Sequence, residues 1–157
     1  MDVKTEITVN IPGLHKFRSQ VKKGGGQIRV AYDRWALRYR AFVQRRFDKF
    51  SRGGGDWPAL VSRKGSILRD TNTLFTALTP TLNAPSGSIN KLIEGGIEVG
   101  YGGGGSHPGG PTISELAYWH QTGAGNNPVR EIIVQPDAAT IRGMVEDMQK
   151  AVDAEST

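Results

Sequence analysis

The chain has 157 residues and a formal net charge of +5, with 37% hydrophobic and 22% charged residues. This length suits a single folded domain, and the apolar content lies above that of disordered chains. The chain contains no cysteine, which excludes disulfides, thiolate nucleophiles and Cys-ligated metal sites. No stretch approaches the roughly 18 apolar residues of a membrane helix, and no apolar signal-peptide core follows Met1, so we expect a soluble protein made in the cytoplasm.

Charge is distributed unevenly along the chain. Residues 1–70 contain 16 Lys or Arg against 6 Asp or Glu, whereas residues 71–157 contain 4 against 9. Opposite charges on the two halves favour electrostatic steering of a head-to-tail partner, or a surface at one end that faces nucleic acid.

The first third of the chain predicts one strand and one long helix. Apolar and polar residues alternate from Val3 to Ile11, which indicates a half-buried strand within an N-terminal arm, residues 1–13. Residues 14–26 are basic and end in three glycines, which favours a loop. Residues 27–50 have the periodicity of an amphipathic helix. Its apolar side consists of Ile28, Tyr32, Trp35, Tyr39, Phe42, Phe47 and Phe50.

The other side of this helix is basic. It carries Arg29, Arg34, Arg38, Arg45 and Lys49, with Arg40 and Arg46 at its flanks. We favour a solvated face on which Arg and Lys stems lie along the helix, over a dedicated track for phosphates. If the face does bind something, Arg34, Arg38, Arg45 and Lys49 are the candidate contacts for DNA or an acidic partner.

The middle of the chain predicts a short helix and a hairpin. Trp57 follows the glycines at 53–55 and is expected to be a packing residue. Asp70 or Thr71 can cap a short helix that Pro80 stops. The apolar runs 89–93 and 97–101 flank a Glu-Gly-Gly turn, which indicates a β-hairpin.

The last third predicts a helix, a strand and a second helix. Residues 101–112 form a flexible glycine-rich loop, after which Thr112 and Glu115 have the spacing of a capping box for a helix ending at Gly123. Residues 132–134 are expected to form a short buried strand, and Asp137 to cap a final helix with Glu146 and Asp147 on its solvated face. The whole chain, 1–157, therefore reads as one α+β domain, in which a long helix and a C-terminal helix cover a small, mostly antiparallel sheet.

The sequence does not contain a convincing catalytic or ligand-binding motif. Residues 100–105 match the letters of the dinucleotide fingerprint, but no helix opens on the last glycine, and a Walker A sequence is lacking. The histidines, His15, His107 and His120, have no metal-ligand spacing. We expect no catalytic residue, no cofactor and no metal site. A metal-dependent hydrolase built around His120 is the least favoured alternative because no second ligand is visible.

Four short segments carry a family resemblance through their order and spacing. They are WPAL at 57–60, ILRDTNTL at 67–74, AYWHQTG at 117–123 and PVR at 128–130. Together they resemble the virion-morphogenesis or tail-completion proteins of tailed bacteriophages, the Mu G-protein type, over about residues 27–153. The sequence departs from the family pattern at Asn72, where Gly is usual, at Leu116, where Tyr is usual, at Ala77 and at Glu131. Asn is the next best residue after Gly for a left-handed backbone.

The resemblance implies a structural virion protein without catalysis. It implies a ring of six copies at the head-proximal end of the tail, which completes the tail and joins it to the head connector. The implied partners are the chain itself, the head–tail connector and tail tube proteins, and genomic DNA passing through the lumen; the implied location is the neck of the virion, after assembly in the host cytoplasm.

The resemblance also suggests roles for particular residues. Asp70, Thr71 and Asn72 would form a turn that sets the following helix, and His120, Gln121 and Gly123 a helix end that holds the adjacent loop. Arg130 would make a bridging ion pair, because a guanidinium can bind two carboxylate oxygens at once. The alternative function is a nucleic-acid-binding module that uses the basic region 15–52, where 12 Lys or Arg face 2 acids.

Overall fold

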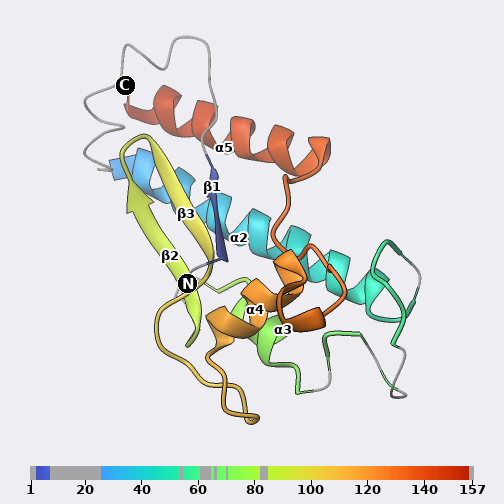
Figure 1. Ribbon diagram of the computed structural model, residues 1–157. Coiled ribbons are helices and arrows are strands. Elements are labelled where there is room, and N and C mark those ends of the chain that lie inside the picture. The colour runs from blue at the N-terminus through green and yellow to red at the C-terminus, as the bar shows by residue number, and fades with distance from the viewer. Residues whose placement is uncertain are drawn as a thin grey trace.

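The computed structural model describes residues 3–7, 26–53, 55–60, 65, 67–69, 71–81 and 85–155. In chain order it contains β1 (Val3–Ile7), α2 (Gly26–Phe50), α3 (Thr73–Ala77), β2 (Ser88–Ile93), β3 (Gly96–Tyr101), α4 (Ile113–Thr122), the 3-10 helix η2 (Ala124–Asn126) and α5 (Ala138–Glu155). The fold is α+β, as the sequence predicts, with a small antiparallel sheet beside a long helix and a C-terminal helix (Figure 1). Among the described helices, none is long and apolar enough to cross a membrane.

The sheet has three strands in the order β1-β3-β2, all antiparallel to their neighbours. β2 and β3 form the predicted hairpin, and its turn contains Gly95 with a φ of 77°. β1 pairs with the other edge of β3, with Val3 opposite Tyr101. Gly100 allows this approach, because a Cβ there would collide with the backbone of β1.

Several sequence predictions concern residues outside the described part of the chain. Residues 8–11 of the expected strand, the basic stretch 14–25 with His15, and Asp70 belong to this group. Predictions about them remain predictions.

α2 contributes most of the core. All seven predicted apolar residues of this helix are buried, as the periodicity indicates. Tyr32 meets Trp35 edge to face with ring centroids 5.1 Å apart, and burial raises the pKa of Tyr32 to about 12. The Trp35 indole nitrogen donates to the Met144 carbonyl at 2.7 Å, which connects the core of α2 directly to α5.

α5 runs antiparallel along α2 (Figure 1). The Asp137 carboxylate accepts the amide of Thr140 at 2.8 Å, which confirms the predicted cap. At the opposite end of α5, the Glu155 carboxylate accepts the amide of Gln27 at 2.6 Å. The C-terminal helix thus supplies an acidic cap for the first turn of α2, which contains no acidic residue of its own.

The glycine-rich segment 102–111 follows a path with several backbone hydrogen bonds. The amide of His107 donates to the Pro111 carbonyl at 2.8 Å, and the Gly110 amide returns to the His107 carbonyl at 2.9 Å. Ser106 bridges to Thr112, at the point where the predicted capping box with Glu115 opens α4. Composition alone did not indicate these contacts; the expected flexibility of the segment remains a prediction.

Candidate functional site

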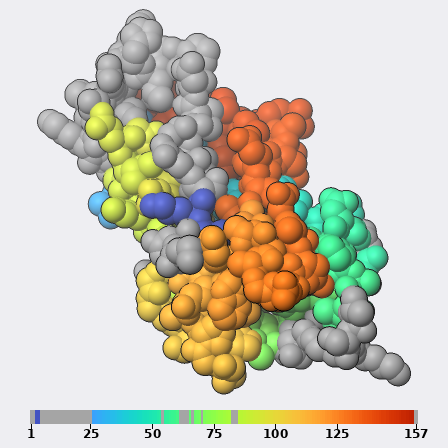
Figure 2. Space-filling model, in the orientation of Figure 1, coloured from blue at the N-terminus to red at the C-terminus, as the bar shows by residue number. Residues whose placement is uncertain are grey.

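The four segments that carry the family resemblance meet at one end of the fold. The turn 57–60 lies beside the last turns of α2, α3 and α4 lie next to each other, and the chain from 124 to 134 leads from α4 toward α5 (Figure 1). Figure 2 shows this connecting chain in orange against the residues near position 50 in teal. Segments separated by up to about 70 positions therefore form a single structural unit, whose contacts follow.

Trp57 anchors the first segment, as a packing residue. It is 5% exposed and its ring stands edge-on to both Phe47 and Phe50, at centroid distances of 5.1 and 5.6 Å. The indole nitrogen donates to the Glu131 carbonyl at 3.2 Å. The first segment is thereby joined to the chain immediately after the fourth.

Arg130 makes the second link between these segments. Its side chain is buried, and Nε and Nη2 both donate to the Pro58 carbonyl, at 3.2 and 3.0 Å. Its backbone amide donates to the carbonyl of His120 at 2.7 Å. The bridging ion pair suggested for Arg130 stays a prediction; the contacts above direct Nε and Nη2 at a backbone oxygen within the chain. Removing the side chain should therefore affect folding before assembly.

Gln121 links α4 to the segment 132–134. Its Oε1 accepts the amides of Ile132 and Ile133 at 2.9 and 3.0 Å, and its Nε2 donates to the Ile133 carbonyl at 2.8 Å. The predicted strand at 132–134 is wrong, because this stretch is irregular although Ile132 and Ile133 are buried as expected. One glutamine side chain provides the hydrogen bonds that a neighbouring strand would have provided.

Gly123 ends α4, as predicted, and fixes the path of the following loop. Its φ is 77°, and its amide donates to the Trp119 carbonyl. A Cβ at this position would lie 2.9 Å from a methyl group of Val129. The position thus requires glycine both for its backbone conformation and for the close approach of the fourth segment.

His120 lies at a small pocket to which all four segments contribute lining residues. The pocket is lined by Leu60, Leu68, Thr71, Leu74, Leu116, His120 and Arg130. Its volume of about 80 Å³ has room for a few water molecules, whereas pockets for small-molecule ligands are usually several times larger. The lining is mostly leucine, so the pocket is a seam between packed segments.

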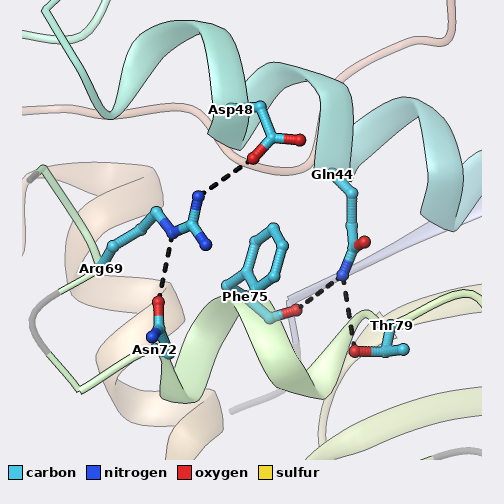
Figure 3. Close-up of polar contacts among 6 residues, drawn as sticks. All are labelled: Gln44, Asp48, Arg69, Asn72, Phe75 and Thr79. Atoms are coloured by element: carbon cyan, nitrogen blue, oxygen red, sulfur yellow. Dashed lines mark hydrogen bonds and ion pairs between the residues drawn. The ribbon is translucent and has the colours of Figure 1, made fainter.

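The turn before α3 differs in detail from the prediction (Figure 3). Thr71 does not cap the helix; the residue at the cap position is Asn72, which has a φ of 56° and makes no capping bond with its side chain. The left-handed conformation expected from Asn in place of Gly is confirmed. The Asn72 side chain is occupied elsewhere, because its Oδ1 accepts the Arg69 guanidinium at 3.1 Å.

Arg69 fastens this turn to α2. It pairs with Asp48 at 3.0 Å and stacks over the Phe75 ring at 4.1 Å. Beside it, Gln44 of α2 donates to the Phe75 carbonyl at 3.2 Å (Figure 3). These contacts set α3 against α2, as a turn that positions the following helix should, but Arg69 and Gln44 had no signal in the sequence beyond their charge and polarity.

The four candidate basic residues of α2, Arg34, Arg38, Arg45 and Lys49, are all exposed. Two of them also contact α5. Arg38 binds Asp147 through Nε at 2.6 Å, and Arg45 donates to the Thr140 hydroxyl at 3.3 Å.

Two charged residues that the sequence analysis placed in solvent, Asp147 and Arg40, are buried. Asp147 is 4% exposed, so its place on a solvated face is wrong; its hydrogen bond and charge raise the pKa of Arg38. Arg40 is fully buried and donates to the carbonyls of Thr79 and Ile89 at 3.2 and 3.3 Å, while burial lowers its pKa. Helical periodicity cannot show that a remote segment will cover one flank of a helix.

Neither a metal-binding cluster nor a similar known protein identifies a function for this site. Within the described ranges, no group of three or more His, Asp or Glu side chains could hold a metal ion. What the geometry does provide is a unit of four converging segments, with Gln121 and Arg130 as its polar links. In comparisons with known proteins, the chain matches no family model, no curated protein and no solved structure.

Proposed function

We propose that this protein is a structural virion protein of a tailed bacteriophage, which completes the head-proximal end of the tail and joins it to the head connector as a ring of copies. The observation that carries the proposal is the convergence of the four segments on which the family resemblance rests. Arg130 connects the first, third and fourth segments through hydrogen bonds to the carbonyls of Pro58 and His120. The second segment joins them at the small pocket, which Leu68, Thr71 and Leu74 line together with His120 and Arg130.

The chemistry of the converging residues supports a scaffolding role. Gln121 and Arg130 bind backbone amides and carbonyls of neighbouring segments, so these side chains hold the segments in place. The loop that these side chains hold carries Val129 and Glu131, and both residues are exposed on the molecular surface. A rigid loop on a compact unit suits docking to other proteins.

Deletion of the gene from its parent phage genome tests the proposal. Electron microscopy of the lysate should show filled heads beside unjoined or malformed tails, and expression of the wild-type protein from a plasmid should restore joined particles. A deletion lysate with normal numbers of joined virions would overturn the proposal. Counting heads, tails and joined particles separately assumes no particular ring symmetry.

A nucleic-acid-binding module is the second candidate, because several cations on and after α2 are exposed. They are Arg29, Arg34, Arg38, Arg45, Lys49 and Arg52. Binding to a short DNA duplex, followed by fluorescence anisotropy, should then weaken steeply between 50 and 200 mM salt, by about tenfold for every two phosphates neutralised. Arg34→Glu and Lys49→Glu should each reduce the salt dependence. Binding that is weak and indifferent to salt would exclude this candidate.

A further inference from the structure

Two exposed valines mark opposite ends of α2. Among the described residues, Val30 and Val129 are the large hydrophobic side chains that stay exposed, at 40% and 50%. Val30 lies in the second turn of α2, whereas Val129 lies on the loop beside its last turns. Single exposed apolar residues are common on protein surfaces, so their surroundings decide whether they have a role.

Val129 borders a surface hollow that combines three apolar side chains with three charged ones, which we name the Trp57 hollow. Its lining consists of Arg46, Asp56, Trp57, Val129, Glu131 and Val134. The hollow has a volume of about 280 Å³, which is ample for an aliphatic side chain. Asp56 and Glu131 are exposed at its edge, so two negative charges accompany the single positive charge of Arg46.

Val30 stands on a basic surface that is complementary to this hollow. Arg34 lies one helical turn further on the same side of α2 and is exposed, and we name these two residues the Val30 face. Arg29 is also exposed nearby, while Asp33 is half-buried. An apolar side chain with neighbouring cations thus lies at one end of α2, and a hollow that contains both apolar side chains and two carboxylates lies at the other.

The two surfaces cannot meet within one chain. Arg46, which lines the hollow, lies 16 positions beyond Val30 on α2. At 1.5 Å and 100° per residue, this separation is about 24 Å along the axis and about 160° around it. Complementary surfaces that face in nearly opposite directions join successive copies head to tail, and such contacts close into rings when the rotation permits.

We propose that the Val30 face of one copy docks into the Trp57 hollow of the next copy. Val30 would lie against the apolar lining residues, and Arg34 beside Asp56 and Glu131. The occupant is a second copy of this chain, and the charges of the two surfaces are the argument for it. The inference rests on the proposed ring, for which it specifies the contact.

Charge reversal on each surface gives a decisive test. Arg34→Glu alters only the Val30 face and Glu131→Arg only the hollow, and both side chains are exposed, so the variants should fold. Sedimentation velocity of the full chain at low salt should show concentration-dependent association for the wild type. Each single variant should associate about tenfold more weakly. A mixture of the two variants should associate again, because every contact between unlike copies then pairs opposite charges.

The matched control is Arg142→Glu, an identical charge change at an exposed position of α5 outside both surfaces, which should associate like the wild type. A wild-type protein that stays monomeric, single variants that associate normally, or a mixture that stays dissociated would each overturn the inference. If the variants lose joined virions in the deletion phage while association in solution is unchanged, the hollow binds another virion protein, and the inference fails although the proposed function stands.

Discussion

Gln121→Ala should be among the most destabilising single changes outside the apolar core. The truncation removes three hydrogen bonds, two to the amides of Ile132 and Ile133 and one to the Ile133 carbonyl. At about 1 kcal/mol for each bond, the free energy of unfolding should fall by about 3 kcal/mol. The two isoleucines are buried, so the released backbone groups cannot all reach water without displacing apolar contacts.

Urea unfolding followed by tryptophan fluorescence measures this loss. For a chain of this size, about 3 kcal/mol corresponds to a fall of roughly 6 to 12 °C in Tm. Gln149→Ala is the matched control, because Gln149 is exposed on α5 and bonds only to Asp153 among the described contacts. It should change the free energy of unfolding by less than about 0.5 kcal/mol. A loss at Gln121 as small as that of the control would refute the reasoning.

Four further substitutions test separate contacts. Arg130→Ala should lower the free energy of unfolding by about 3 kcal/mol, since the Pro58 carbonyl loses its guanidinium donors and a large buried side chain is removed. Unchanged urea unfolding would exclude the assigned tertiary link. Gly123→Ala should lower the free energy of unfolding more than Gly103→Ala does. Both glycines have positive φ, but only a Cβ at position 123 would meet a neighbouring side chain. Equal losses of stability would show that the backbone conformation alone matters. Glu155→Gln should weaken the cap of α2 by about 1 kcal/mol, seen as faster hydrogen exchange in its first turn. The hydrogen bonds from Thr140 lower the pKa of Asp137, so the contribution of the Asp137 carboxylate to stability is present above about pH 4 and is lost in acid. Asp137→Asn should flatten this acid dependence of the free energy of unfolding. An unaltered acid profile would argue against the cap.

Local patterns in the sequence were enough to predict most of the elements. The apolar stripe of α2, the hairpin 88–101 and the capping box at Thr112 depend on residues within a few positions of each other. The left-handed turn at Asn72 is equally local, since a short polar side chain tolerates that backbone conformation. In each case the physical cause lies within one or two turns of chain.

Tertiary structure alone decided where the polar side chains bind. Gln121 replaces a strand partner for residues 132–134, Arg40 is covered by a segment about 40 positions away, and Asp147 is buried by Arg38 from another helix. Periodicity carries no information on such partners, because a hydrogen bond between remote residues depends on how whole elements pack. The sequence by itself thus determined the α+β elements and their apolar faces. Packing determined which polar groups became internal links and which, such as Arg34 and Glu131, stayed exposed.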